Sequence, residues 1–192
     1  MGIIFPILTF FISAIPFGYL ITKAVKGVDI RQYGSGNIGA TNVSRVCGKK
    51  WGIVVFILDL LKGFIPVLIC NQFYGEFWAG ISAVSAVLGH SFTPYLRFKG
   101  GRGVAVGLGS FLGIIPAQAG IAFGIWLISL KISRIVSLSS MIASASLPFL
   151  CYIFGKSGIL IITTGIGAAI VILRHTPNIK RLIKGEEPKI GR

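Results

Sequence analysis

The chain has 192 residues, of which 54% are hydrophobic and only 12% are charged, with a mean hydropathy of +0.84 and a net charge of +14. A water-soluble domain keeps roughly a quarter of its residues charged, so these values exclude an ordinary soluble protein. They predict a single polytopic domain over residues 1–192 whose main solvent is lipid.

Seven apolar segments follow one another along the chain and predict an all-α integral membrane protein, a seven-transmembrane-helix bundle. The predicted helices cover residues 3–22, 51–70, 77–89, 104–115, 117–130, 136–154 and 158–173. The third, fourth and fifth are shorter than the roughly 17 to 25 residues that cross a hydrocarbon core. We therefore expect these three to extend into flanking loops or to enter the membrane without crossing it. Glycines at four-residue spacing between residues 103 and 124 predict close helix packing.

Basic residues lie in alternate loops, which predicts the orientation of the bundle. Lysines and arginines gather in residues 23–50, 97–102, 131–134 and 174–192, whereas only Lys156 lies in the remaining loops. Because cytoplasmic loops collect Lys and Arg, we expect the N-terminus outside and the C-terminus in the cytoplasm. The positive charge then reflects orientation and anionic headgroups, and no nucleic-acid-binding motif accompanies it.

Two simpler features limit the chemistry. The first apolar segment has no basic n-region and no small-residue cleavage site, so we expect a retained span and not a signal peptide. Cys47, Cys70 and Cys151 are scattered, with no C-x-x-C pair and no histidine cluster beside them. We expect free thiols, and neither a metal site nor a cofactor.

The loop after the first predicted helix has the composition of an anion site. Glycines at positions 34, 36 and 39 can adopt positive φ and turn successive backbone N–H groups toward one point. Arg45 adds a planar cation that pairs well with phosphate. A helix that begins near residue 41 would add its N-terminal amides. The neutral side-chain donors of this loop are Ser35, Asn37, Thr41 and Asn42.

Other interpretations of this loop fit less well. The spacing of Gly34, Gly36 and Gly39 matches the dinucleotide-binding fingerprint, but no strand precedes it. A P-loop would require a lysine where Ala40 stands. A glycine-rich turn needed only for tight geometry is the structural alternative. The added donors and Arg45 favour a ligand site.

Two more cationic segments lie on the same predicted face. Residues 99–103 read Lys-Gly-Gly-Arg-Gly, and the glycines around Arg102 favour a second phosphate-sized turn, although a positive-inside anchor would explain the charges alone. His90, taken alone, is better explained as an interfacial polar residue. His175 and Asn178 follow the last predicted helix, where attraction to anionic lipid is the simpler explanation.

Asp59 and Lys62 lie within the second predicted helix, three residues apart and therefore on one helical face. Ionisable side chains are costly in a membrane, so both should face the bundle interior and can pair. We favour a structural role for them over a functional one.

Together these motifs resemble those of the bacterial acyl-phosphate:glycerol-3-phosphate acyltransferases. The resemblance is carried by residues 34–45, 59–63, 89–90, 98–104, 137–140 and 174–179. Three positions depart from the usual pattern of the family: Arg102 replaces a more common lysine, Ser44 a leucine and Thr176 an arginine. The first departure keeps a cation.

The resemblance implies an enzyme of the bacterial cytoplasmic (inner) membrane, with its active site facing the cytoplasm. It would transfer a fatty acyl group from acyl phosphate to the 1-hydroxyl of glycerol 3-phosphate in phospholipid biosynthesis, giving lysophosphatidic acid and inorganic phosphate. Its partners would be the two substrates and membrane lipids, with no metal and no nucleic acid. The implied catalytic residues are Ser35, Arg45, His90, His175 and Asn178. The implied phosphate-binding residues are Ser35, Gly36, Asn37, Gly39, Thr41, Asn42, Arg45, Lys99, Gly101, Arg102, Ser140, His175 and Asn178.

The general base stays open at this point. Soluble acyltransferases use H-x-x-x-x-D, but Tyr95 stands five residues after His90 and Lys180 stands five after His175. The base is therefore either a histidine oriented by another group or the substrate's own phosphate. Ser35 as a covalent nucleophile is disfavoured because no base stands beside it.

The alternative function is a membrane transporter or channel for phosphate or an organic anion, which would also surround an anion with glycine-rich half-helices and arginines. Such a protein should show paired interrupted helices and polar groups near the membrane midplane. Here the donors gather on one face, which favours the enzyme.

Overall fold

The computed structural model describes residues 2–191, and every regular element within that range is a helix. The all-α prediction is therefore confirmed for this part of the chain. In chain order the elements are α1 (Ile4–Ala14), α2 (Phe17–Lys26), the 3₁₀ helix η1 (Ile30–Gln32), α3 (Ala40–Cys47), α4 (Lys49–Ser91), the 3₁₀ helix η2 (Pro94–Leu96), α5 (Val104–Leu112), α6 (Pro116–Ser133), α7 (Val136–Ile153), α8 (Gly158–Arg174) and α9 (Thr176–Ile183).

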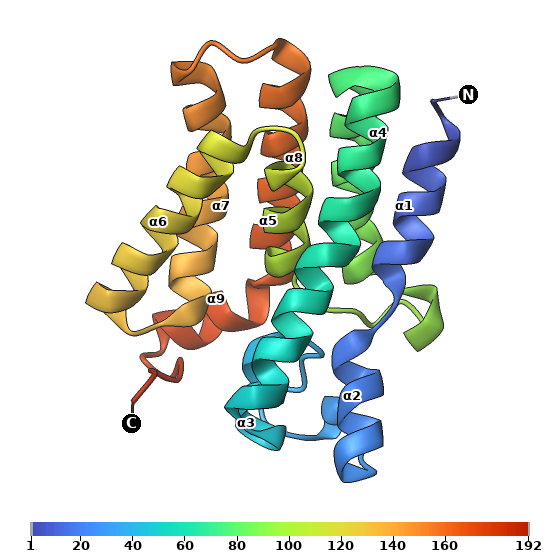
Figure 1. The fold of residues 1–192 in the computed structure, drawn as a ribbon. Coiled ribbons are helices and arrows are strands. Elements are labelled where there is room, and N and C mark those ends of the chain that lie inside the picture. Colours follow the sequence, from blue (N-terminus) through green and yellow to red (C-terminus); the bar gives the residue numbers. More distant parts are fainter. Residues whose placement is uncertain (1, 192) are drawn as a thin grey trace.

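The long helices lie side by side in a bundle (Figure 1). α1 and α4 form one side, α6 and α7 form the other, and α5 and α8 lie between them. α1 begins at one end of the bundle, whereas α3 and α9 lie at the opposite end. Among residues 2–191, three helical segments are long and apolar enough to cross a membrane, Ile4–Lys26, Lys49–Leu96 and Val136–Ile153, and the bent pair of α8 and α9 is a fourth candidate.

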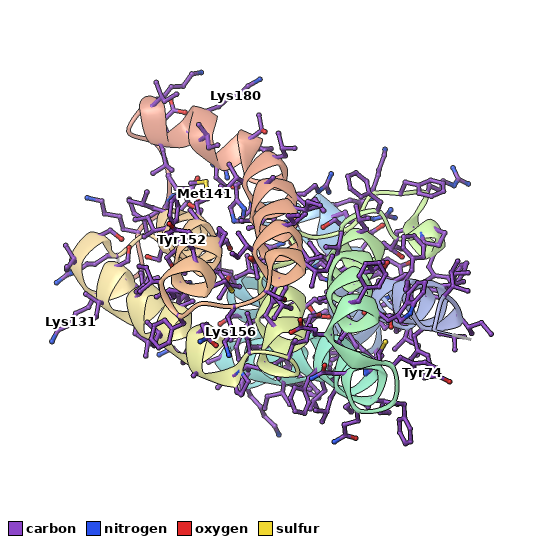
Figure 2. The ribbon with its side chains drawn as sticks, turned by 90° about the horizontal axis from the view of Figure 1, so that it is seen from above. Tyr74, Lys131, Met141, Tyr152, Lys156 and Lys180 are labelled. Carbon is purple, nitrogen blue, oxygen red and sulfur yellow. The ribbon has the colours of Figure 1, made fainter. Side chains whose placement is uncertain are left out.

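The outer faces of these helices carry large apolar side chains. Ile7 on α1 is 56% exposed, Phe149 on α7 is 68% exposed and Ile162 on α8 is 59% exposed. Seen along the bundle, Lys131 and Lys180 lie at the periphery of the helices (Figure 2). Apolar surface on this scale would be unfavourable in water, whereas lipid chains satisfy it.

α4 reverses direction at Gly75, which has φ 77° and ψ 175°, a conformation open almost only to glycine. The two halves then fold back on each other, since Ser82 Oγ donates to Cys70 Sγ at 3.5 Å. The helices predicted at residues 51–70 and 77–89 are these two halves.

The helix predicted at residues 3–22 is divided into α1 and α2 at Ile15 and Pro16. Proline has no N–H to continue the helical ladder, and it disfavours helical ψ in the residue before it. At this break the carbonyl of Ile15 accepts hydrogen bonds from the backbone N of Phe17 at 3.1 Å and from Lys62 Nζ at 2.7 Å.

The glycines of α5 and α6 differ in their packing. Gly109 and Gly113 face the backbone of α4, and a Cβ on Gly109 would collide with the carbonyl of Leu60. These glycines let α5 lie directly against α4. A Cβ on Gly120 or Gly124 would meet no atom within 4 Å. The close packing predicted for this second pair is therefore wrong, because their face of α6 is open.

Candidate active site

The first glycine-rich loop is organised by the buried side chain of Asn42, which is 2% exposed. Its Oδ1 accepts a hydrogen bond from the backbone N of Ser35 at 2.9 Å. Its Nδ2 donates to the carbonyl oxygens of Tyr33 at 3.0 Å and Asn37 at 2.9 Å. Asn42 therefore holds the loop against the first turn of α3.

The glycines of this loop adopt two conformations. Gly34 and Gly36 have positive φ of 59° and 69°, as predicted. Gly39, by contrast, has an ordinary φ of −76° because it is the residue before α3. Its N–H donates to Asn37 Oδ1 at 2.7 Å. The glycine amides thus do not converge as predicted, and the unpaired amides at the first turn of α3 are those available to a ligand.

The second loop, residues 97–103, is held from a distance by Arg174 at the end of α8. Its Nη2 donates to the carbonyl of Gly100 at 3.0 Å and its Nε donates to the carbonyl of Gly101 at 3.1 Å. Its guanidinium also lies over the ring of Phe92, 5.1 Å from the centroid. The backbone N of Gly101 donates to the carbonyl of His90 at 3.0 Å, which places the loop above that histidine.

Arginines from four segments approach one another at the end of the bundle where α3 and α9 lie, which we call the cationic end. Burial lowers the pKa of the Arg102 guanidinium to about 10. Other charges act on the same group: Glu187 raises this pKa, whereas Arg181, Arg45 and Arg174 lower it. One carboxylate among four guanidinium groups leaves an excess of positive charge that favours an anionic ligand.

Glu187 is a carboxylate at this end, and it ties the tail to the bundle. It accepts hydrogen bonds from Ser137 Oγ at 2.7 Å, Asn178 Nδ2 at 2.5 Å and Arg181 Nε at 2.7 Å. Burial by itself would raise the pKa of Glu187, but these hydrogen bonds outweigh it and hold the pKa below its ordinary value. Sequence reasoning missed Glu187 because a glutamate in a polar tail has no local pattern that distinguishes it from a solvated one.

Two buried histidines face this region. His175 is 1% exposed, and its Nδ1 lies 2.7 Å from the carbonyl oxygen of Val171. A carbonyl only accepts, so Nδ1 carries the proton and Nε2 is left as an acceptor. His90 is 4% exposed and contacts Lys62, whose Nζ lies 3.1 Å from His90 Nδ1 and 2.7 Å from Asp59 Oδ1. The predicted pairing of Asp59 with Lys62 is therefore present.

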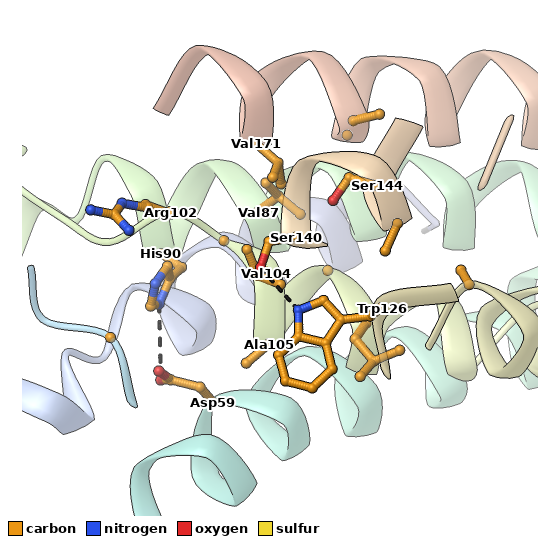
Figure 3. A pocket seen from close by; sticks show the side chains of 18 of the residues that line it. Asp59, Val87, His90, Arg102, Val104, Ala105, Trp126, Ser140, Ser144 and Val171 are labelled. Atoms are coloured by element: carbon orange, nitrogen blue, oxygen red, sulfur yellow. Dashed lines mark hydrogen bonds and ion pairs between the residues drawn. The ribbon is translucent and has the colours of Figure 1, made fainter. Parts of the chain in front are cut away.

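A cavity of about 350 Å³ connects these groups to the interior of the bundle (Figure 3). His90 and Arg102 lie toward one side of it, with Asp59 below, and Ser140 and Trp126 lie farther along (Figure 3). The polar side chains of the lining are those of Asn37, Thr41, Asp59, His90, Arg102, Ser137, Ser140, Ser144, Thr164 and His175. Most of the remaining lining is apolar and comes from α5, α6, α7 and α8, including Leu108, Phe111, Ala119, Ala122, Phe123, Ala143, Leu147, Ala168 and Val171. The cavity thus joins a polar entrance to an apolar interior.

The predicted site residues divide into two groups. Those that line the cavity are Asn37, Gly39, Thr41, His90, Arg102, Ser140 and His175. Those outside its lining are Ser35, Gly36, Asn42, Arg45, Lys99, Gly101 and Asn178. Within the second group, Asn42 accepts a hydrogen bond from Ser35 and so supports the first loop. Asn178 donates a hydrogen bond to Glu187, and Lys99 is exposed.

Ser140 is less free than its position in the cavity suggests. Its Oγ donates to the carbonyl of Val136 at 2.8 Å and accepts from Trp126 Nε1 at 3.1 Å. Trp126 stacks on Phe123 with ring centroids 5.7 Å apart. Sequence reasoning also missed Trp126, since an aromatic residue in an apolar segment is expected to pack against lipid or core.

Comparisons with known proteins agree with this geometry. The family described as glycerol-3-phosphate acyltransferase matches residues 3–185. A glycerol-3-phosphate acyltransferase from Desulfotalea psychrophila is 45% identical over 97% of this chain and 97% of its own. One from Geotalea daltonii is 48% identical over 93% of this chain and 92% of its own.

Two crystal structures of PlsY, an integral membrane glycerol 3-phosphate acyltransferase, share the fold. The glycerol 3-phosphate form is 39% identical with a TM-score of 0.96, covering 99% of this chain and 96% of that one. The lysophosphatidic acid form is 38% identical with a TM-score of 0.93, covering 99% and 95%. The prediction of an all-helical integral membrane protein is confirmed, and the chain belongs to the glycerol-3-phosphate acyltransferase family.

Proposed function

We propose that this protein transfers a fatty acyl group from acyl phosphate to the 1-hydroxyl of glycerol 3-phosphate, releasing lysophosphatidic acid and inorganic phosphate, in phospholipid biosynthesis. The observation that carries this proposal is the cavity, which joins a cationic entrance to an apolar interior between α5, α6, α7 and α8. Both substrates carry phosphate and one carries a fatty chain, so the two halves of the cavity match them. Glycerol 3-phosphate and lysophosphatidic acid, named in the two PlsY forms, are a substrate and a product of this reaction.

The two substrates would occupy different sides of the entrance. The phosphate of acyl phosphate would lie between Asn37, the first turn of α3 and Arg102, with Lys99 at the mouth, while its fatty chain enters the apolar interior. Arg45, Ser140, His175 and Asn178 would place glycerol 3-phosphate beside the acyl carbonyl. Ser35, Gly36, Asn42 and Gly101 would act by shaping the two loops. This arrangement supplies proximity and charge stabilisation.

In the reaction the 1-hydroxyl oxygen forms a bond to the acyl carbon, and the bond from that carbon to the phosphate oxygen breaks. The hydroxyl proton passes to His175 Nε2 or to the departing phosphate. His175 is the better placed histidine for a base, because its Nε2 is left as an acceptor. Near-wild-type turnover in both His175→Ala and His90→Ala would exclude a histidine base and assign the proton to phosphate.

The membrane topology also belongs to this proposal. Crossings by α1 with α2, the two halves of α4, α5, α6, α7 and α8 would number seven and place the N-terminus outside. The loop between α7 and α8, at the end of the bundle opposite α3 and α9 (Figure 1), carries the lone Lys156, and the basic residues gather at the cationic end, which supports this orientation. The protein would lie in the inner membrane of a bacterium, with its active site facing the cytoplasm. Residues 1–192 would form one domain. α5 has nine residues, so the segment before it, residues 99–103, which has no regular secondary structure, would complete that crossing.

Cysteine labelling tests the topology. A membrane-impermeant maleimide added to intact cells should label Lys156→Cys and leave Lys184→Cys unlabelled until the membrane is broken. Labelling of the wild-type protein, whose three cysteines are buried or half-buried, gives the background. Labelling of Lys184→Cys in intact cells would place the C-terminal tail outside and so contradict the proposed orientation.

The activity itself is tested with purified protein in detergent, given acyl phosphate and glycerol 3-phosphate. We expect lysophosphatidic acid and inorganic phosphate in equal amounts. Arg45→Gln should raise the KM for a phosphate substrate about tenfold through loss of a charge-assisted contact, whereas Arg134→Gln, at the exposed end of α6, should not. Absence of product, together with anion flux in liposomes, would favour the transporter instead.

A further inference from the structure

Lys62 lies in the interior of the bundle, where its side chain is in contact with three acceptors. It is 6% exposed, and its Nζ lies 2.7 Å from the carbonyl oxygen of Ile15, 2.7 Å from Asp59 Oδ1 and 3.1 Å from His90 Nδ1. A lysine ammonium has three N–H bonds and no acceptor. Lys62 therefore donates hydrogen bonds to the carbonyl of Ile15 and to His90 Nδ1, and its ammonium group forms an ion pair with Asp59.

This arrangement fixes the proton of His90. Because Nδ1 accepts from Lys62, it carries no proton, and a neutral imidazole then carries its single proton on Nε2. Asp59 Oδ1 lies 3.9 Å from the same Nδ1 (dashed line, Figure 3), which is beyond hydrogen-bond distance. The carboxylate therefore does not orient His90 as a base, and Lys62 is the hydrogen-bonding partner instead.

The other ring nitrogen of His90 faces the second loop. Nε2 lies beneath Gly101, where a Cβ would collide with it. His90 and Arg102 both line the cavity, and no hydrogen-bond partner of Nε2 is found among residues 2–191. Nε2 is not one of the fully buried atoms that lack a partner, so it is accessible from the cavity and can donate to a ligand. Beside a cationic loop, the group that would satisfy it is an oxygen of an anionic substrate.

We propose that Lys62 is a positioning residue that holds His90 as its Nε2–H tautomer, so that His90 donates a hydrogen bond to an oxygen of the acyl phosphate and does not act as a general base. This inference rests on the proposed acyl transfer. It gives the two histidines opposite roles, because His175 presents an acceptor to the site and His90 presents a donor. It also gives the buried pair Asp59 and Lys62 a function beyond helix packing.

The tautomer can be measured without any substrate. The sequence contains two histidines, so protein labelled with ¹⁵N in the imidazole rings, carrying His175→Gln, gives a spectrum of His90 alone. We expect a protonated Nε2 and an unprotonated Nδ1. A proton on Nδ1 would overturn the proposal, and because Lys62 is unchanged in this protein, poor folding of a Lys62 variant cannot obscure the result.

The role of Lys62 is tested by removing both buried charges together. Asp59→Leu/Lys62→Met avoids an uncompensated buried carboxylate, which a single Lys62 change would leave. We expect the His90 spectrum of this variant to show both tautomers and its kcat to fall. An unchanged Nε2–H tautomer would show that Lys62 does not set the proton.

The role of His90 is tested by conservative replacement. His90→Leu, which removes the donor, should lower kcat about a hundredfold. His90→Gln keeps an N–H donor near the position of Nε2 but cannot act as a base, so it should recover roughly tenfold of that loss. Equal loss in the two variants would contradict a donor role. If the wild-type protein makes no lysophosphatidic acid, the proposed reaction fails, whereas the tautomer measurement still decides the effect of Lys62.

Discussion

The two glycine loops at the cationic end are both suited to hold phosphate, yet they are supported in different ways. The first loop is supported from within, by Asn42, whose hydrogen bonds reach back no farther than residue 30. The second loop is supported from outside, by Arg174, which lies more than 70 residues away in the sequence. It also rests on His90, which Lys62 positions.

This difference separates two kinds of polar residue in a binding site. In the first loop the supporting residue and the ligand-facing residues belong to one short segment, so the loop forms with α3. In the second loop the conformation depends on α4 and α8 being in place. The conformation of the first loop should therefore depend on residues of its own segment, whereas that of the second loop should depend on contacts with α4 and α8.

The largest effect is expected where the second loop meets His90. In Gly101→Ala the new methyl group would collide with His90 Nε2, which displaces either the loop or the ring. We expect turnover to fall at least about a hundredfold, as on loss of a positioned donor. Gly120→Ala is the matched control, since its methyl group meets nothing within 4 Å. It should leave turnover unchanged and stabilise α6 by up to roughly 1 kcal/mol. Equal activities of Gly101→Ala and Gly120→Ala would contradict the proposed contact between the second loop and His90.

Next in size is the loss of the support of the first loop. Asn42→Ala leaves the backbone groups of Ser35, Tyr33 and Asn37 without their partner. The expected destabilisation is about 3 kcal/mol, or roughly 6 to 12 °C in Tm. Asn71→Ala, which removes one hydrogen bond of 3.3 Å to Gly113, should cost less than half as much. A larger loss at position 71 would show that the first loop does not depend on its own asparagine.

Much of the fold follows from the sequence because a membrane helix needs a long apolar segment, and such segments are visible without knowledge of their neighbours. The glycines and donors of the first loop are contiguous in the sequence, so this segment could be singled out as one loop, and its anion binding stays a prediction. Proline and glycine are residues that typically interrupt helices. Gly75, where α4 reverses, lies between two predicted helices, whereas Pro16, which separates α1 from α2, lies inside one. Long apolar segments mask such breaks.

The contacts that complete the site were not predictable because they join distant segments. From the sequence, Arg174 is explained as one of the basic residues of a cytoplasmic loop, but in the structure it donates hydrogen bonds to the carbonyls of Gly100 and Gly101. From the sequence, Trp126 is explained as a lipid-facing aromatic residue, but in the structure it donates a hydrogen bond to Ser140. In each case the local pattern is complete without the partner, so only the packed structure reveals the contact.

A smaller effect is expected from the distant support of the second loop. Arg174→Gln removes the two donors that hold the carbonyls of Gly100 and Gly101, but it leaves the contact between Gly101 and His90 in place. The KM for acyl phosphate should rise about tenfold through the loosened loop, with a smaller change in kcat. Steady-state kinetics on Arg174→Gln and the exposed Arg134→Gln would measure it. A change confined to kcat would mean that Arg174 supports the chemistry and not the loop.

The smallest effect concerns Glu187 and depends on pH. The folded pKa of Glu187 lies below its ordinary value, so its carboxylate stabilises the protein above that ordinary value and loses this effect as pH falls through the folded pKa. Glu187→Gln should therefore be less stable than the wild type at pH 7 by about 1 kcal/mol, and the gap should close as the solution becomes acidic. Tm values of both proteins at neutral and acidic pH test this. A constant gap would show that the charge of Glu187 is not what holds the tail.

The reversal of α4 at Gly75 also bears on how the chain is made. Lys62 finds all its acceptors in residues that are synthesised by position 90: Ile15, Asp59 and His90. The hairpin of α4 therefore needs no later helix to satisfy its ammonium group, and it can leave the ribosome and insert into the bilayer beside α1 with its charges already paired. Helices α5 to α8, which enclose the apolar interior, are synthesised later and pack against buried polar groups that are already paired.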